Sequence, residues 1–242
     1  IPQSVTSLGP RVFAECAGLT SIIISPNVVI IEHEAFKGCS SLTDFTVPQG
    51  VTRIGYGAFA DCTGLTSINI PQNVISIEQE AFKGCSGLTS ITIPQSVTNI
   101  GQSIFAYCTG LTSIPIPQGF SYIPAGAFEG CTGLKNAIVP QGILFIDSSA
   151  FSFCSSLTSI TIPEGVTDIR SWAFAHCRGL ININIPDSVT SIGRYAFYDC
   201  TGLISTTFSS ATTTIYDHEN TIPTRTKIIG YDPSTAKDYA TK

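Results

Sequence analysis

Hydrophobic positions recur along the chain with a fixed period of 23 residues. Each cysteine has a phenylalanine three residues before it and a leucine three residues after it. The nine cysteines are Cys16, Cys39, Cys62, Cys85, Cys108, Cys131, Cys154, Cys177 and Cys200. Strict self-similarity at such a period is typical of solenoids, in which each unit buries its apolar positions against its neighbours. The pattern therefore predicts a stack of about nine coils.

The outward leg of each coil is expected to contain a β-strand. In the repeat that begins at Cys62, the apolar residues Leu65, Ile68 and Ile70 follow an L-x-x-I-x-I spacing, and the last two alternate as in a strand. Pro71 then ends the strand, because proline has no N–H to donate to a sheet.

The return leg carries a second set of apolar positions. Val74 and Ile77 form one pair, and Ala81, Phe82 and Cys85 follow at spacings of one and three residues. This spacing predicts a short helical turn that leads into the next strand.

Together these patterns predict an α/β repeat solenoid. We expect a right-handed leucine-rich-repeat superhelix of about nine 23-residue units, with a parallel sheet on one face and short strands or turns with single helical turns on the other. Residues 1–208 form the solenoid in this prediction. Residues 209–242 form a Ser/Thr-rich connector and a C-terminal cap, with a strand at 226–231 and a helix at 232–240 that starts at Asp232 and Pro233.

Composition narrows the classes of partner. Charged residues make up 12% of the chain, against about 25% in an average soluble protein. The net charge is −5 and Lys and Arg form no run, which argues against nucleic acid and anionic membranes as partners. No stretch approaches the ~18 apolar residues of a membrane helix. The chain opens within a repeat and contains no methionine, so we expect a piece of a longer protein with targeting or anchoring signals outside it.

The cysteines are expected to be unpaired. Equivalent residues in neighbouring coils lie about 4.8 Å apart, but their Cβ vectors run parallel, whereas a disulfide requires them to be angled towards each other. We interpret each cysteine as a small buried hydrophobic residue. A metal array is the alternative, although no second type of ligand recurs beside the cysteines. We expect no cofactor and no metal.

Departures from the repeat are the positions where recognition would be encoded. The outward strand positions are small, polar and nearly uncharged, which fits either a solvated sheet face or a surface that binds a repetitive ligand. Pro115 occupies a strand position that should donate a hydrogen bond, which indicates a local kink or, alternatively, a hinge with a functional role.

Large side chains gather at outward return-side positions in the C-terminal half. Aromatic residues and arginine are enriched at binding hot spots. The candidate binding residues are Tyr122, Phe145, Arg170, Trp172, Arg194, Tyr195 and Tyr198. His176 and Arg178 lie close by. Stacking of these side chains on one another as local stabilisation is the alternative interpretation.

Nothing in the sequence indicates catalysis. The histidines are His33, His176 and His218, which are widely separated. Cys177 follows His176 but belongs to the buried column, and Glu32 and Glu34 flank His33 without converging on it. Glycines recur at repeat turns and form no phosphate-binding loop. We therefore predict that the chain is not an enzyme.

The repeat resembles a known family. The string I-P-x-x-V-x-x-I-x-x-x-A-F-x-x-C-x-x-L runs from Ile70 to Leu88 and recurs at 93–111, with Ile104 for the alanine, and at 185–203. It is similar to the BspA-like leucine-rich repeat, also called the Treponema-type repeat, over roughly residues 1–208. Residues 229–240 are similar to the terminal unit of such arrays, whose physical role would be to cover the open sheet.

The resemblance implies a bacterial or protist cell-surface protein that adheres to host matrix proteins or to other microbes. The leading hypothesis is thus an extracellular recognition domain for a protein or glycan. A rigid spacer that projects other domains from the cell surface is the second hypothesis. A recognition module attached to an enzyme elsewhere in a longer chain is the third.

Overall fold

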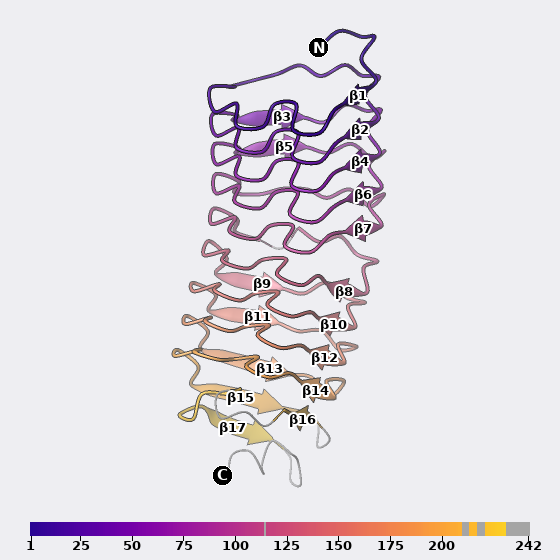
Figure 1. Cartoon of the computed structure of the whole chain (residues 1–242). Helices are drawn as coiled ribbons and strands as arrows, with labels where there is room; N and C mark the ends of the chain where they lie inside the picture. Colours follow the sequence, from indigo (N-terminus) through magenta and orange to yellow (C-terminus); the bar gives the residue numbers. More distant parts are fainter. Residues whose placement is uncertain (114, 210–212, 217–220, 231–242) are drawn as a thin grey trace. The chain divides into compact units, whose positions relative to one another are not determined.

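The computed structural model describes residues 1–113, 115–209, 213–216 and 221–230 of the chain. The chain forms two compact units, Ile1–Pro117 and Gln118–Lys242. Within each unit, short strands lie one coil above the next (Figure 1). All strand pairings in the described residues are parallel, as expected for a solenoid in which each coil returns to the same place.

The first unit contains two sheets. A five-stranded sheet has the order β1 (Ser7–Leu8), β2 (Ile30–Ile31), β4 (Arg53–Ile54), β6 (Ser76–Ile77) and β7 (Asn99–Ile100). A two-stranded sheet pairs β3 (Asp44–Thr46) with β5 (Ser67–Asn69).

The second unit repeats this plan with one more sheet. A five-stranded sheet contains β8 (Tyr122–Ile123), β10 (Phe145–Ile146), β12 (Asp168–Ile169), β14 (Ser191–Ile192) and β16 (Thr214–Ile215). The second sheet pairs β9 (Asn136–Ile138) with β11 (Ser159–Thr161). The third has the order β13 (Asn182–Ile185), β15 (Ser205–Phe208) and β17 (Lys227–Gly230).

The strand prediction is confirmed in position and in side-chain direction. In β5, Ile68 is buried between exposed Ser67 and Asn69, as the alternating pattern requires. Partners across the sheets are 23 residues apart, as in Phe45 opposite Ile68. The last pair is shorter, because Ser205 lies opposite Lys227. The chain is therefore a parallel-strand β-solenoid within each unit.

The helical turns of the predicted α/β fold are not found, because the described residues contain no helix. The segment before each cysteine is a turn with left-handed residues, as at Gly57 (φ 57°) and Asp61 (φ 59°), and a right-handed helix cannot continue through such residues. Phe59 N donates to Ala81 O of the next coil (2.8 Å), while Ala60 N bonds back to Gly57 O (2.9 Å). Alternate N–H groups thus serve the neighbouring coil and the turn itself.

The interior consists of columns of identical side chains. The phenylalanines stack coil on coil at 5.2–5.7 Å between ring centroids, in the first unit from Phe13 to Phe105 and in the second from Phe128 to Phe197. Parallel offset stacking at this spacing contributes beyond the burial of the rings. From Phe36 onward every ring of this column is buried, so each coil depends on its neighbours for its core.

All nine cysteines are free, as predicted, and eight of them are buried. Cys16, in the most N-terminal coil of the described residues, is exposed. The thiols also have a role that the sequence did not reveal. Cys62 Sγ donates to Phe36 O (3.0 Å), and Cys200 Sγ donates to Phe174 O in the same way (3.0 Å). Each such bond satisfies a buried carbonyl of the preceding coil.

The repeat that contains Pro115 departs from the others. Neither Ser90–Ile91–Thr92 nor the described residues around Pro115 form a strand, although the equivalent residues form β3 and β5 in earlier coils. Pro115 has no N–H for the sheet, which explains the loss of regular pairing at this coil. At the C-terminal end, β17 confirms a strand within 226–231, whereas the helix predicted at 232–240 lies outside the described residues.

Candidate functional site

Two rows of left-handed residues run along the turns of the solenoid. One row lies five residues before each cysteine and consists of Arg11, Glu34, Gly57, Glu80, Ser103, Gly126, Ser149, Trp172 and Tyr195. The other lies directly before each cysteine and consists of Glu15, Gly38, Asp61, Gly84, Tyr107, Gly130, Phe153, His176 and Asp199. We call these the fifth-position row and the pre-cysteine row. Every non-glycine residue with positive φ in the described part of the chain belongs to one of them.

These positions carry a conformational cost for any residue with a Cβ. A left-handed residue other than glycine costs roughly 1–2 kcal/mol, and aromatic residues are uncommon there. Glycine fills several of the positions, as at Gly84 and Gly130, but the second unit places Phe153, Trp172 and Tyr195 there instead. Non-glycine residues in such backbone regions gather at functional sites more often than elsewhere.

Three aromatic side chains of the candidate set form one contact group. Trp172 and Tyr195 belong to adjacent coils, and their rings stack at 4.3 Å. Tyr198 meets both edge-on, at 5.6 Å from Trp172 and 5.7 Å from Tyr195. Trp172 keeps 37% of its surface exposed. We call Trp172, Tyr195 and Tyr198 the aromatic cluster.

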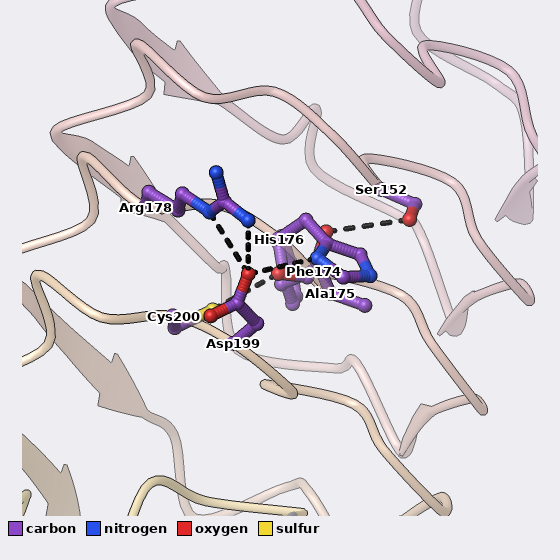
Figure 2. Close-up of polar contacts among 7 residues, drawn as sticks. All are labelled: Ser152, Phe174, Ala175, His176, Arg178, Asp199 and Cys200. Atoms are coloured by element: carbon purple, nitrogen blue, oxygen red, sulfur yellow. Dashed lines mark hydrogen bonds and ion pairs between the residues drawn. The ribbon is translucent and has the colours of Figure 1, made fainter.

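A polar group adjoins the aromatic cluster and is centred on Asp199. Its Oδ2 atom accepts hydrogen bonds from Arg178 Nε (2.8 Å) and from His176 Nδ1 (3.0 Å), and Arg178 NH2 lies 2.7 Å away. Figure 2 shows both side chains reaching the same carboxylate. These hydrogen bonds, first that from Arg178, hold the pKa of Asp199 below its usual value. His176 stacks on Phe153 at 4.2 Å and meets Tyr198 edge-on at 5.3 Å, which joins the two groups.

Three other candidates, Tyr122, Phe145 and Arg170, form a second group at the five-stranded sheet of the same unit. Tyr122 in β8 stacks on Phe145 in β10 at 5.1 Å. The Arg170 guanidinium lies 3.9 Å from the centre of the Phe145 ring and 3.1 Å from Asp147 Oδ1. This is a cation–π contact supported by an ion pair. Among the described residues, no ring or ion-pair contact links this group to the aromatic cluster.

The structure thus divides the predicted set. It gathers Trp172, Tyr195 and Tyr198 in one place and Tyr122, Phe145 and Arg170 in another. Arg194 joins neither group through its side chain, which is exposed, although its carbonyl accepts a hydrogen bond from Trp172 N (3.0 Å).

Sequence reasoning missed Phe153 and Asp199. Both stand in the pre-cysteine row on either side of His176, at one-repeat spacing. That spacing was a usable signal, because residues 23 positions apart lie directly above one another in such a stack.

In the first unit the same rows carry several charged residues, and Tyr107 is their one aromatic residue among the described positions. Glu34 pairs with Lys37 (2.9 Å) and Arg11 (3.3 Å), and the hydrogen bond from Lys37 holds the pKa of Glu34 below its usual value. Tyr56 donates its hydroxyl to Glu80 Oε2 (3.2 Å). The Glu34 carboxylate next to His33 in sequence is thus paired with two cations, and the His33 side chain is exposed.

The neighbouring residues His176 and Cys177 do not have the geometry of a catalytic pair. Cys177, next to His176, points into the core and donates to Phe151 O (3.1 Å), and burial raises its pKa well above the ordinary value. Across the described residues, no group of three or more His, Cys, Asp or Glu side chains could hold a metal ion. The described part of the chain also has no helix that is long and apolar enough to cross a membrane.

The coil-on-coil columns and parallel sheets define the class of protein: a leucine-rich-repeat solenoid, a fold that is typically non-catalytic. The chain belongs to the family described as the BspA type leucine-rich repeat region, whose model matches residues 1–112 and 121–221 in six copies.

Solved structures of bacterial leucine-rich-repeat proteins are similar to this chain. A leucine-rich cell surface protein from Faecalibacterium prausnitzii is 27% identical, with a TM-score of 0.65, over 98% of this chain and 72% of that one. A leucine-rich-repeat protein from Bacteroides ovatus is 28% identical, with a TM-score of 0.59, over 88% and 68%. The Treponema pallidum leucine-rich-repeat protein is 33% identical, with a TM-score of 0.59, over 66% and 75%. None of the curated proteins compared with the chain matches it.

Proposed function

We propose that the chain is a non-catalytic recognition module at the cell surface, which adheres to a protein or glycan on host matrix or on other cells. The F. prausnitzii protein with the same fold is described as a cell surface protein, which supports an extracellular location. The family supports a role in interaction or as a scaffold. Neither nucleic acid nor direct membrane insertion is part of the proposal, because the chain has a net charge of −5 and no basic run.

One observation carries the proposal: exposed aromatic side chains occupy strained left-handed positions in the second unit. Trp172 (φ 63°) and Phe153 (φ 60°) are 37% and 46% exposed. Glycine at these positions would relieve the strain, as it does at Gly130 two coils before His176. An aromatic residue there adds contact area that a partner can cover, and such residues are typical anchors of interfaces. Arg170, Arg194, Tyr122 and Phe145 extend the proposed surface.

The experiment is a binding screen against immobilised fibronectin and fibrinogen and a glycan panel, followed by Trp172→Ala and Tyr195→Ala. For a true ligand, each variant should weaken binding by about tenfold or more. The free energy of unfolding should fall by no more than the ~0.5–1.5 kcal/mol of an aromatic pair. Tyr107→Ala is the matched control, because Tyr107 is an exposed aromatic residue in the pre-cysteine row of the other unit.

A second function, a rigid spacer, is supported by the regular interior of each unit. Within each unit, stacked phenylalanines and thiol–carbonyl bonds join successive coils. A spacer would show no saturable binding to any member of the panel. Equal losses of binding and stability in the Trp172 and Tyr195 variants would also contradict the recognition proposal, because they would assign those rings to packing.

A further inference from the structure

A small pocket opens beside the aromatic cluster. It has a volume of about 330 Å³ and is lined by Tyr198, Asp199, Thr201, Pro223, Thr224 and Arg225. Ligand pockets span roughly 300–1,000 Å³, so this one is at the lower limit and suits a ligand of about one ring.

The polar groups of the pocket are held by a fixed frame. Arg178 and His176 both bond to Oδ2 of Asp199, and Oδ1 of Asp199 has no hydrogen-bond partner among the described residues. The carboxylate is thus anchored by one oxygen, and its other oxygen is available as an acceptor. The hydroxyls of Thr201 and Thr224 likewise bond to no other described side chain or carbonyl.

The remaining walls supply a cation and an apolar surface. Arg225 is exposed and forms no ion pair with another described residue. Tyr198 is held edge-on by Trp172, Tyr195 and His176, which fixes the plane of its ring. Pro223 adds a second apolar ring. The pocket therefore combines one carboxylate acceptor, one guanidinium donor, hydroxyls and a fixed aromatic ring.

These groups discriminate between ligand classes. A peptide carboxylate would gain Arg225 but would face the carboxylate of Asp199, and like charges at close range destabilise a complex. A lysine or arginine of a partner would meet Arg225 and compete with Arg178 for Asp199. Neighbouring sugar hydroxyls both donate and accept, so one pair can donate to Asp199 Oδ1 and accept from Arg225. The apolar face of a sugar ring can then lie against Tyr198.

We propose that this pocket binds a single hexose unit of a glycan, with Asp199 as acceptor, Arg225 as donor and Tyr198 as apolar wall. The inference rests on the proposed recognition function, for which it names the ligand class and a subsite. A contact with one sugar ring is weak by itself, with a Kd in the ~millimolar range. The affinity rises when the aromatic cluster binds the rest of the same glycan or glycoprotein.

The test is a titration of the ¹⁵N-labelled chain with methyl glucoside, methyl galactoside and methyl glucuronide, followed by backbone amide shifts. At least one of the two neutral glycosides should shift the backbone amides of residues 198–201, Thr224 and Arg225 saturably. Arg225→Ala should weaken that binding by about tenfold. Lys135→Ala is the control, because Lys135 is an exposed cation of the same unit outside the pocket and should leave the affinity unchanged.

The outcomes separate this inference from the proposed function. Acetyl-Glu-Glu-amide is titrated in the same way, as a probe for an acidic peptide ligand. If no glycoside shifts these amides, or if only this peptide does, the proposed hexose pocket is wrong. If Trp172→Ala still abolishes binding to a partner from the panel, the recognition function stands without the hexose pocket. If glycosides shift the amides and Arg225→Ala removes the effect, the pocket stands whatever the protein panel shows.

Discussion

At the scale of single residues, backbone conformation at two positions per coil decides what the outer surface can display. The fifth-position and pre-cysteine rows are left-handed in every coil from Arg11 to Asp199. Residues with a Cβ occupy these positions at an energetic cost, whereas glycine occupies them freely. The usual order of alanine and glycine in stability should therefore be reversed there.

Ser149 allows this reversal to be measured. Its φ is 58°, so Ser149→Gly should be more stable than Ser149→Ala by about 1 kcal/mol. Ser148, the preceding residue, is not left-handed, and there alanine should be the better replacement by roughly 0.5 kcal/mol. Urea unfolding of the four variants gives the comparison. The same order of stability at both positions would contradict the assignment of strain to the row.

The cysteine column makes a prediction about reactivity. Burial raises the pKa of Cys62, Cys108, Cys154 and Cys200 to about 12, while Cys16 is exposed. At about pH 8 the thiolate fraction of a group with that pKa is about one in ten thousand, and the thiolate is the reactive form. Iodoacetamide should label Cys16 alone in the native chain and all nine cysteines after denaturation, as read by mass spectrometry.

The same burial has a consequence for stability at alkaline pH. The thiols of the unfolded chain ionise near their ordinary value of 9.0, whereas Cys62 in the folded chain stays protonated to about 12. The contribution of the protonated Cys62 thiol to the free energy of unfolding is therefore complete below about pH 9. This contribution is lost as the pH rises through the pKa of the folded state. A control with Cys16→Ser should show the same loss, since Cys16 is exposed.

At the scale of the element, the turn that carries Asp199 ties three coils together. Asp199 receives Arg178 and His176 from the preceding coil, and His176 stacks on Phe153 one coil further back. An asparagine tolerates the left-handed backbone of Asp199 (φ 55°), so Asp199→Asn removes the charge with little added strain.

This variant predicts a defined pH dependence. The pKa of Asp199 in the folded state is lowered from 3.8, its ordinary value. Its contribution to the free energy of unfolding is therefore present above the pKa of the unfolded state and is lost as the pH falls through the lower pKa of the folded state. Asp199→Asn should cost about 1 kcal/mol or less near neutral pH, given partial exposure, and nothing in strong acid. Urea unfolding over that pH range measures it. A difference that does not shrink on acidification would contradict the ion pair as its source.

The sequence predicted the elements unevenly, and the reasons are physical. Alternation at Ile68 and Ile70 placed the strand, because the period of two has no other common cause. The spacing of Ala81, Phe82 and Cys85 suits a helical turn and a left-handed turn equally, so the helix prediction failed where Glu80 (φ 58°) reverses the backbone. Trp172 and Tyr195 are 23 residues apart and stack in the structure, and the same spacing relates Phe153 to His176 and His176 to Asp199.

At the scale of the whole molecule, the sheets of a solenoid need a covered edge. We propose that residues 209–242 act as a cap through β17, whose residues Lys227–Gly230 pair with every residue of β15. Without that partner, the N–H and C=O groups of β15 would be left open to other chains.

Truncation tests the cap. A chain that ends at Phe208 should unfold at lower urea and self-associate on size exclusion, because it loses β17 and exposes β15. A chain that ends at Gly230 keeps β17 and is the matched control. If the two truncated chains behave alike, β17 is not what protects β15, and the capping role is contradicted.

The constant register of the coils has a consequence for how such a surface can change over generations. Each coil offers its neighbour the same columns in the same places, as in Phe151 between Phe128 and Phe174. A duplication or loss of one whole repeat in the gene would join matching columns and leave the interior intact. The displayed rows would gain or lose one side chain each. New combinations of exposed residues could therefore be sampled by recombination without the chain having to invent a new fold.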